Sequence, residues 1–464
     1  MRRLLCALLV ALLMPQLVCA QSARSYSLPE ARLAAQEALT QRAYGLALQL
    51  GMGLLQADPN DGQAHFIVSQ AQAGLGQLAK ARKAARKAFA KARKPRDRFT
   101  AAQASAGLAL RDGRYGAAQY WLRRALETAP APAARRQTIA DFKRLQALKT
   151  VTWDLDLALG PSSNVNAGAE TAELSIDGLT PVGVLSADAQ ALSGSVAKVD
   201  LRARYKLHST SNSLWHWQLR VFQRNVRLST AAKARAPELH SSDLSFGRYE
   251  LGLQKLWHTN QRPQQALHAP RRHRLSLTLG ETLSAGKKYS SALTVGYLQQ
   301  QNPAPGASFV WGGQLSQLTY SAPPKHRGTE LELRANFTKN LENKSYFQAG
   351  LTLRHIETAQ INTSQRSVLA HLRYGFGQPV GPAKLDLTLS AQHSHFADYA
   401  IGFIRVPGGR TDKSAAATLN LRFESYERAG FVPSLALQYQ ASRSNISRFT
   451  ARGATLTLGL SSSF

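Results

Sequence analysis

The chain has 464 residues and a formal net charge of +30, because 58 lysines and arginines outnumber 28 aspartates and glutamates. Hydrophobic residues make up 44% and charged residues 19% of the chain, which excludes a disordered or collagen-like protein. Its two cysteines, Cys6 and Cys19, lie in the first twenty residues. If that segment is removed, the mature protein has no disulfide, no thiolate nucleophile and no zinc site with cysteine ligands.

Residues 1–20 have the features of a secretory signal peptide. A basic start precedes an apolar stretch from Leu4 to Val18, and small side chains stand three residues and one residue before Gln21. No stretch of the chain has the roughly 18 to 20 apolar residues of a membrane helix. A lipoprotein modified at Cys19 is the alternative, although Val18 is a poor residue before a modified cysteine. We expect an exported envelope protein, either soluble in the periplasm or a β-barrel.

Residues 21–149 are expected to form a periplasmic domain of helical repeats. Apolar residues recur with helical spacing, and a short motif recurs at Tyr44, Leu78 and Tyr115, which are 34 and 37 residues apart. An alanine follows each motif residue by three positions (Ala47, Ala81 and Ala118). The pattern resembles the tetratricopeptide repeat (TPR), in which small residues let paired helices approach closely. An ordinary alanine-rich helical bundle is the alternative.

A dense basic run lies within these repeats, between Lys80 and Arg98, where Asp97 is the one acidic residue. On a helix the cations would cover most of the perimeter apart from a face of alanines and Phe89. Such a run fits a solvated helix face, an acidic partner protein or anionic lipid headgroups. Nucleic acid is a common partner of basic chains, but an exported protein would meet little of it.

Residues 150–464 are expected to form an outer-membrane barrel. From Val151 onward apolar and polar residues alternate with period two, in about fourteen stretches roughly 22 residues apart, which suits membrane strands of about 9 to 11 residues. Aromatic residues recur near the strand ends, as in a membrane girdle. Long and short connections alternate, and the connection 257–271 is an exception, where a strand is misplaced or a turn is elaborated. The predicted fold class is α + β multidomain: N-terminal TPR-like α-helical repeats, then a transmembrane antiparallel β-barrel of about fourteen strands.

The last strand carries a more specific signal. Leu456, Leu458, Leu460 and Phe464 share one face, and Phe464 is the final residue of the sequence. A terminal phenylalanine after an alternating strand resembles the signal by which the barrel-assembly machinery recognises outer-membrane barrels for insertion. We therefore expect the barrel-assembly machinery and outer-membrane lipid among the partners of this chain.

The same alternation predicts a basic lumen. Among the residues predicted to point inward, several carboxylates (Asp154, Asp156, Asp200, Glu330, Glu332 and Glu424) provide opposite charge. The predicted lumen arginines are Arg202, Arg204, Arg220, Arg334, Arg354, Arg373 and Arg422. Such a lumen attracts anionic or acidic cargo, or is cross-braced and largely closed by arginine–carboxylate pairs. Both readings remain open at this point.

Several short motifs add a family resemblance. The first strand ends in Gly160-Pro161-Ser162-Ser163-Asn164-Val165-Asn166. The chain closes with Gly430-Phe431-Val432-Pro433, then Ser442-Arg443-Ser444-Asn445-Ile446, and a last strand ending in Phe464. Behind helical repeats, this combination resembles the Slam family, the surface lipoprotein assembly modulators, also called type XI secretion translocons. The resemblance covers nearly the whole mature chain, although the repeat domain is short and very basic.

The resemblance implies protein export. Slam-like proteins move a surface lipoprotein or a soluble secreted protein from the periplasm to the cell surface or medium. The repeat domain is then expected to engage the exported cargo or a periplasmic chaperone. It also implies a location in the outer membrane of a Gram-negative cell, with the N-terminal domain in the periplasm and no cofactor.

A seam motif is a candidate functional site, because the first and last strands of a closed barrel are neighbours. Its residues are Pro161, Ser162, Ser163, Asn164, Asn166, Ser444 and Asn445. We hypothesise that they form a polar clasp that gates lateral passage or pins a plug. Asparagine-rich turns without further function are the alternative, because asparagine tolerates left-handed backbone and caps its own turn.

Enzymatic functions find little support in the sequence. It contains no His-Glu-x-x-His motif, no Gly-x-Ser-x-Gly elbow and no phosphate-binding lysine loop. His393 and His395 share a strand face, but two histidines without a third ligand are a weak metal site. Two other transport functions remain as alternatives: an outer-membrane polysaccharide exporter that also combines helical repeats with a barrel, and an anion-selective porin.

Overall fold

The computed structural model describes residues 26–177, 182–259, 271–321, 324–428 and 430–462. The expected signal peptide (1–20) and the expected insertion signal Phe464 lie outside the described residues. The chain divides into two compact units, and the boundary between them lies between Ala147 and Leu148. Among the helices that the structure describes, none is long and apolar enough to cross a membrane.

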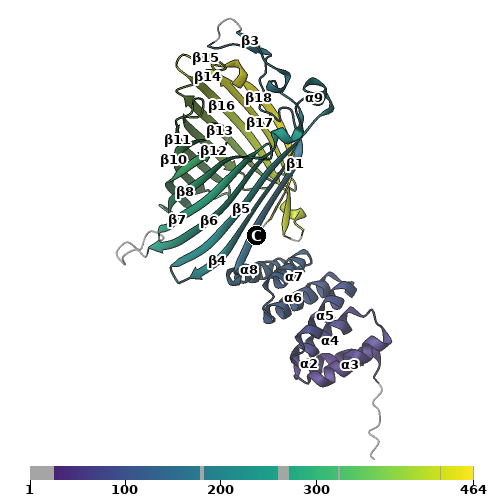
Figure 1. Ribbon diagram of the computed structural model, residues 1–464. Coiled ribbons are helices and arrows are strands. Elements are labelled where there is room, and N and C mark those ends of the chain that lie inside the picture. Colours follow the sequence, from purple (N-terminus) through teal and green to yellow (C-terminus); the bar gives the residue numbers. More distant parts are fainter. Residues whose placement is uncertain (1–25, 178–181, 260–270, 322–323, 429, 463–464) are drawn as a thin grey trace, which may run out of the picture. The chain divides into compact units, whose positions relative to one another are not determined.

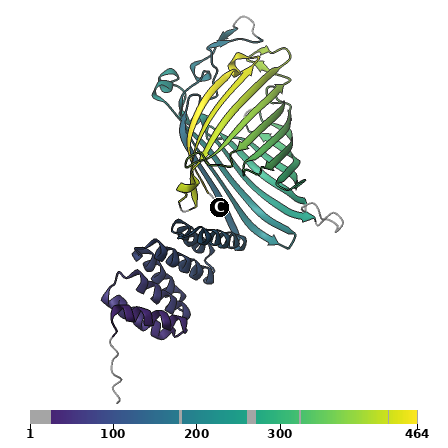
Figure 2. The same cartoon turned by 180° about the vertical axis from the view of Figure 1, so that it is seen from behind.

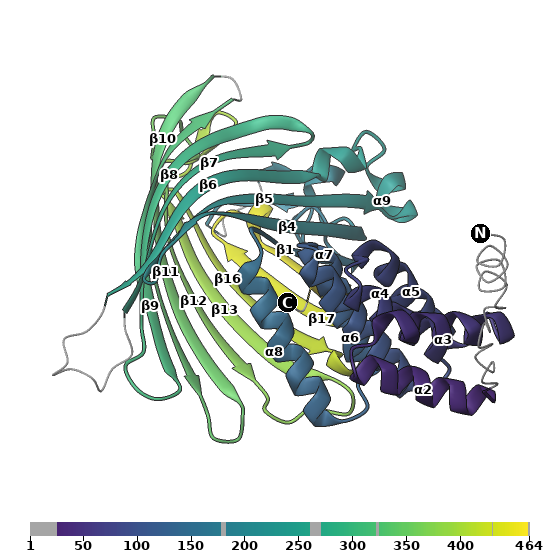
Figure 3. The same ribbon diagram turned by 90° about the horizontal axis from the view of Figure 1, so that it is seen from below.

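The N-terminal unit consists of antiparallel helix pairs, which Figure 3 shows one after another along the chain. Successive helices pack against each other, so that α2 and α3, α4 and α5, and α6 and α7 form hairpins. The helices are α2 (Leu28–Thr40), α3 (Tyr44–Ala57), α4 (Gly62–Gly74), α5 (Leu78–Lys91), α6 (Pro95–Arg111), α7 (Tyr115–Glu127) and α8 (Pro132–Leu148). This arrangement confirms the expected TPR-like repeats.

One turn geometry repeats in all three hairpins. Arg42, Gly76 and Gly113 have φ angles of 60°, 74° and 67°, in the left-handed region, and each lies two residues before the motif residue that begins the second helix. Ala47, Ala81 and Ala118 are buried, at 0–1% exposure, where neighbouring helices approach. The motif at Tyr44, Leu78 and Tyr115 therefore marks the same position of each repeat.

Asp61 ties the first two repeats together. Its carboxylate accepts hydrogen bonds from the main-chain N–H groups of Gln63 (2.8 Å) and Ala64 (3.1 Å), which caps the start of α4. It also pairs with Arg32 of α2 at 2.6 Å. Burial alone would raise the pKa of Asp61, but the hydrogen bonds from Arg32 and the two N–H groups outweigh burial and lower the pKa below its usual value.

The C-terminal unit is a closed antiparallel barrel of fourteen strands (Figure 1). Every strand pairs with its neighbour along the sheet, and β1 and β18 close the ring. The strands are β1 (Val151–Ser162), β4 (Gly194–Ser209), β5 (Ser213–Leu228), β6 (Phe246–Thr259), β7 (Arg271–Ser284), β8 (Lys287–Gln301), β9 (Ala307–Tyr320), β10 (His326–Asn340), β11 (Tyr346–Thr358), β12 (Gln365–Gly375), β13 (Lys384–Phe396), β16 (Arg410–Arg422), β17 (Phe431–Ser444) and β18 (Ala451–Ser462). This confirms the predicted fold class.

The barrel wall has its apolar side chains on the outside. On β7, Leu275, Leu277 and Leu279 are exposed, while Ser276 and Thr278 alternate with them and point inward. A soluble barrel or sandwich would bury these leucines. An apolar outer face around a polar interior is typical of barrels of the outer-membrane type.

The two ends of the barrel differ. The near rim, where β1 begins at Val151 and β18 ends, carries connections such as 210–212 and 302–306. The far rim carries longer loops with small elements that the sequence did not predict: β2 (Glu173–Leu174), β3 (Gly183–Val184), α9 (Thr230–Arg235), β14 (Ala400–Ile401) and β15 (Ile404–Arg405). The exceptional connection expected at 257–271 joins two complete strands, β6 and β7, and its residues 260–270 lie outside the described part.

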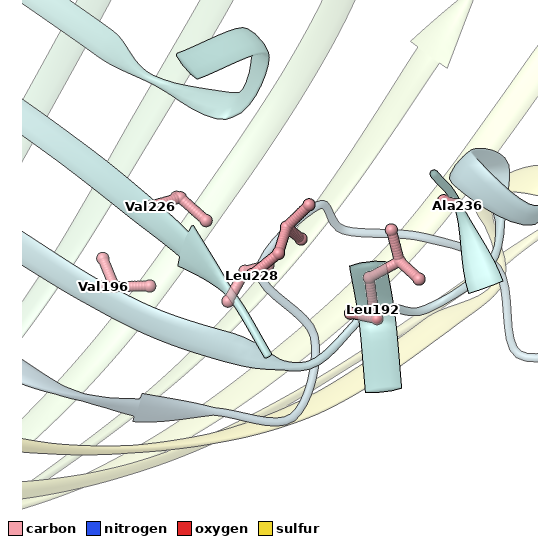
Figure 4. Packing of buried hydrophobic residues seen from close by; sticks show 7 residues of the cluster. Leu192, Val196, Val226, Leu228 and Ala236 are labelled. Carbon is pink, nitrogen blue, oxygen red and sulfur yellow. The ribbon is translucent and has the colours of Figure 1, made fainter. Parts of the chain in front are cut away.

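Part of the far rim has its own apolar core. Val196, Val226 and Leu228 at the ends of β4 and β5 pack with Leu192 of the preceding loop and with Ala236 beyond α9 (Figure 4). These side chains are 1–8% exposed, in contrast to the leucines on the barrel wall. The long first loop is therefore folded onto the barrel end.

Candidate functional site at the barrel seam

The strand pairing of the seam between β1 and β18 has a gap. Its register pairs residues 156–159 with 458–461 and then Ser162 with Thr455, and leaves out Gly160 and Pro161. On its other edge β1 pairs continuously with β4, from Val151 to Ser162. Proline has no N–H group to donate, which contributes to the interruption. A side chain at position 160 would meet the carbonyl oxygen of Leu456 at 1.8 Å, so only glycine fits this close approach.

The serines that follow the interruption bond directly to β18. The hydroxyl of Thr455 donates to the Oγ of Ser162 at 2.9 Å. The Oγ of Ser163 accepts the main-chain N–H of Ala454 at 2.9 Å, and the N–H of Ser163 donates to the carbonyl of Ala454 at 2.9 Å. Side chains of the predicted motif thus close the far end of the seam.

Asn164 extends this contact. Its Nδ2 donates to the carbonyl of Arg452 on β18 at 3.1 Å and to the carbonyl of Gly168 at 2.9 Å, while its Oδ1 accepts the N–H of Gly168. The side chain is buried, at 7% exposure. All three hydrogen bonds of this side chain are to main-chain groups. Asn164 therefore fixes both the seam and the turn that leads away from it.

Asn166 organises the rest of the first loop. Its Nδ2 donates to the carbonyls of Asp188 (2.7 Å) and Gln190 (2.8 Å), and its Oδ1 accepts the N–H of Leu192 at 3.0 Å. The loop returns to β4 through these bonds. Asn166 therefore holds both ends of the loop that covers this part of the far rim.

Ser444 and Asn445 lie at the far end of β17. The Oδ1 of Asn445 accepts the N–H of Thr411 (2.8 Å), and its Nδ2 donates to the carbonyl of Gly409 (2.9 Å). The carbonyl of Asn445 accepts the N–H of Asp177 from the first loop at 2.7 Å. Ser444 accepts the N–H of Ile446 at 3.2 Å. Within the described residues, no hydrogen bond joins the side chains of Asn164 and Asn445; segment 168–177 connects their surroundings.

An apolar and cationic cluster completes the contact between the loops. Ile176 of the first loop forms a β-bridge with Ile446, which is 0% exposed. The guanidinium of Arg410 lies over the rings of Phe449, Phe396 and Tyr399, at 3.2, 4.7 and 5.3 Å from their centroids. Its Nη2 also pairs with Asp412 at 2.5 Å. We call the three loop segments 168–177, 396–410 and 445–450 the seam cap.

The sequence did not identify Arg410 as a functional residue. The rings around it come from two connections, β13–β16 (Phe396 and Tyr399) and β17–β18 (Phe449), and their meeting depends on how these loops fold back over the rim. The sequence feature that points to them is the density of aromatic residues at the ends of β13 and β17. An arginine enclosed by three rings is strongly held when water is excluded.

Five of the seven predicted lumen arginines form ion pairs, four of them with a carboxylate on a neighbouring strand and one, Arg202, within its own strand β4. Asp200 joins Arg202 (2.6 Å) and Arg220 (2.9 Å), and Asp154 pairs with Arg204. Arg354 bonds to Glu332 at 2.9 Å and lies 3.3 Å from Glu330, and Arg373 pairs with Asp386 at 3.0 Å. Arg334 and Arg422 form no ion pair within the described residues. The barrel interior is therefore cross-braced over much of its circumference.

The basic run of the helical unit is a surface feature. Arg82 pairs with Asp112, and the guanidinium of Arg98 donates to the carbonyl of Ala92 at 3.1 Å. The other cations are exposed and form no ion pair in the part of the chain that the structure describes: Lys80, Lys83, Arg86, Lys87, Lys91, Arg93, Lys94 and Arg96. This leaves a cationic surface on α5, on the turn that follows it and on the first turn of α6.

Comparison with known proteins gives matches to solved structures. No family model and no curated protein matches this chain. It is similar to the TPR2B-domain:pHsp70 complex of yeast Sti1, with 18% identity, a TM-score of 0.25, and coverage of 26% of this chain and 98% of that chain. It is also similar to the Yersinia enterocolitica type III secretion chaperone SycD in complex with a peptide of the translocator YopD, with 18% identity, a TM-score of 0.24, and coverage of 27% and 97%.

The two histidines weighed as a weak metal site lie outside the seam motif. His393 and His395 lie on the outward face of β13, opposite Lys413 and Thr411 of β16, and the Nδ1 of His395 is 3.1 Å from the hydroxyl of Thr411. Among the residues that the structure describes, no group of three or more histidine, cysteine or acidic side chains is arranged to hold a metal ion.

Proposed function

We propose that this chain is an outer-membrane translocon that exports specific protein cargo. The cargo is a surface lipoprotein or a soluble secreted protein, which moves from the periplasm to the cell surface or medium. In this proposal the near rim and the helical unit face the periplasm, and the seam cap faces the outside. The TPR-like unit engages the cargo or a periplasmic chaperone that delivers it.

The observation that carries the proposal is the union of a helical-repeat unit and an outer-membrane-type barrel in one chain. Stacked helix pairs form extended docking surfaces for peptides and proteins. A passive pore has no need of such a surface. The cations on α5 that lack ion pairs favour an acidic segment of cargo or chaperone, because opposite charge speeds encounter and selects partners.

The seam supports the Slam-type assignment. Of the motif residues that carry the family resemblance, Pro161 to Asn164 lie at the interrupted seam, Asn445 lies in the seam cap, and Asn166 and Ser444 lie in the first loop and at the end of β17 beside them. In the proposal the seam is the part of the barrel that opens during export. The cross-braced arginine pairs favour a lumen that stays ordered while the seam and cap rearrange.

The test is a comparison of a wild-type strain with one that lacks the gene, by surface labelling and by proteomics of the culture medium. We expect one or a few proteins to disappear from the surface or medium and to accumulate inside the cell. Restoring the gene should return them. Unchanged protein export with loss of a surface polysaccharide would replace this function by polysaccharide export, and unchanged levels of both would favour an anion-selective porin.

A further inference from the structure

A row of basic side chains lies on the outer wall of the barrel near the far rim. The register places His393 of β13 opposite Lys413 of β16, and Lys413 opposite Arg443 of β17. These three basic residues alternate with inward residues along their strands. They share the outward face with exposed leucines such as Leu389 and Leu437. Directly opposite positions lie about 4.5 to 5.5 Å apart at Cβ, so like charges there destabilise the sheet unless an anion joins them.

The protein itself does not supply that anion. Lys413 and Arg443 form no ion pair within the described residues. The nearest carboxylate in sequence, Asp412, points into the barrel and is held by Arg410. Two lipid-facing cations without counter-ions are costly in the apolar part of a membrane, which places them at the level of lipid headgroups.

A shallow hollow lies directly below this row, toward the middle of the barrel. Ala370, Ala391, Ala415 and Ala441 follow one another in register across β12, β13, β16 and β17. Because four methyl groups replace larger side chains, they leave a space of about 440 Å³ that His393, Lys413 and Arg443 also line. The next row, with Leu372, Leu389 and Tyr439, is exposed and bounds it below.

A second hollow of about 380 Å³ adjoins the first along the rim. Arg366 of β12 lies there, opposite His355 on one side and His395 on the other. The strands of β11, β12, β13, β16 and β17, which Figure 2 shows side by side, thus carry a continuous basic band. At about 4.8 Å per strand, the band is wide enough for a headgroup with two separate phosphates.

We propose that this wall binds a bisphosphorylated glycolipid of the lipid A class from the outer leaflet. One phosphate lies on Lys413 and Arg443, a second reaches toward Arg366, and an acyl chain covers the alanine hollow. Along the wall, basic groups lie toward the far rim and apolar groups lie toward the middle of the barrel. This matches the order of phosphates and acyl chains along such a lipid. This inference rests on the proposed outer-membrane placement with the far rim outside, and it does not depend on the exported cargo.

The test is titration of the purified full chain in detergent with bisphosphorylated lipid A, read by native mass spectrometry. The double variant Lys413→Gln/Arg443→Gln should bind about tenfold more weakly or worse, because each charge-assisted contact is lost. The matched control Lys255→Gln/Lys339→Gln removes two lipid-facing lysines near the other rim and should bind like the wild type. Lys413→Arg keeps the charge and should also bind normally.

A second variant tests the hollow independently. Ala415→Phe leaves the charges in place and fills the alanine floor, and it should weaken lipid A binding without loss of the folded barrel, which is checked by heat-modifiable gel mobility. Unchanged lipid A binding by Lys413→Gln/Arg443→Gln overturns the proposal, and so does equal binding of phosphatidylglycerol to the wild type. Neither readout involves export, so failure here is distinct from failure of the translocon function.

Discussion

Asn164 donates a hydrogen bond from its side-chain Nδ2 to the main-chain carbonyl of Arg452, at 3.1 Å and 288 residues further along the chain. This bond joins the start of the first loop to the last strand, immediately beyond the place where Gly160 and Pro161 leave β1 and β18 unpaired. Beyond the interruption, the seam is held by the main-chain bond from Ser163 to Ala454 and by side-chain bonds of Ser162, Ser163 and Asn164. Side-chain bonds open at lower cost than a continuous strand ladder, so the clasp hypothesis predicts that the seam opens at this end.

Replacing both asparagines of the seam motif tests the clasp hypothesis. Asn164→Ala/Asn445→Ala removes hydrogen bonds to β18, Gly168, Thr411 and Gly409, and we expect the cap to lose about 2 to 4 kcal/mol of stability. Cargo export should fail, while the barrel still inserts and shows normal heat-modifiable mobility. Asn225→Ala, which loses one exposed hydrogen bond on β5, is the control and should export normally. Normal export by the double variant would contradict the clasp.

Cross-linking the seam tests where cargo passes. Ser162 and Thr455 are register partners on β1 and β18, and the chain has no cysteine after Cys19. Ser162→Cys/Thr455→Cys should form a disulfide that keeps the seam closed, because opposite strand positions approach disulfide distance. We expect export to stop in the oxidised protein and to return after reduction.

The control for this lock is a second pair of register partners away from the seam. Ser367 of β12 and Ser394 of β13 also point inward and face each other directly. Ser367→Cys/Ser394→Cys should cross-link without any effect on export. Export through an oxidised, fully locked seam would show that cargo passes through the lumen instead.

Arg410 is expected to hold the seam cap together. Arg410→Ala removes the stacking on Phe449, Phe396 and Tyr399 and leaves Asp412 without its partner. A desolvated cation–π contact contributes about 2 kcal/mol, so opening of the cap should become about thirtyfold more frequent. External protease on intact cells should then cut within 168–177 faster. Arg410→Lys should give a smaller increase, because lysine keeps the charge but lacks the planar group that stacks on the rings.

Arg405 provides the matched control for that experiment. It lies in the same segment, but it pairs with Asp398 at the surface, where the arginine side chain is 74% exposed. Exposed ion pairs contribute little to stability. Arg405→Ala should therefore leave the cleavage rate as in the wild type, and equal sensitivity of both variants would show that Arg410 has no special role.

Much of the fold follows from periodicity that the sequence displays openly. The left-handed turn residue before each motif helix makes the three repeats recognisable, even though arginine occupies the position at residue 42. Alternation with period two identified the barrel strands, because a lumen and a lipid phase demand different side chains at neighbouring positions. The alternation identified the inward arginines and carboxylates and left ion pairing as one of two interpretations, and Arg354 with Glu332 is a pair of that kind.

The seam cap was less predictable. Small elements such as β2 and β14 are two residues long, and their pairing depends on loops that meet only after the barrel has closed. Chain order predicted that Asn164 and Asn445 lie together at the closing seam. It did not show that Asn445 bonds toward β16 and that segment 168–177 connects the surroundings of the two. Which arginines form no ion pair among the described residues, as with Arg334 and Arg422, depends on strand stagger, which residue types do not reveal.

Acid should weaken the helical unit through Asp61. The pKa of this carboxyl is lower in the folded chain than in the unfolded chain, since Arg32 and two main-chain N–H groups bind its charged form. Its contribution to stability is therefore fully present above the unfolded value of about 3.9 and is lost as the pH falls through the lower folded value. The melting temperature of the helices, followed in the full chain by circular dichroism, should decrease as the pH is lowered through this window.

The variant Asp61→Asn distinguishes the effect of the carboxylate charge from the effect of capping α4. Asparagine still caps α4 well, but it cannot form the ion pair with Arg32 or change its charge with pH. The variant should melt earlier than the wild type near neutral pH, and the difference between the two should shrink as acid protonates Asp61. Asp58→Asn, at a carboxylate that accepts one local N–H group from Asn60, should keep the acid response of the wild type. An Asp61→Asn protein with the full acid response would mean that another group carries it.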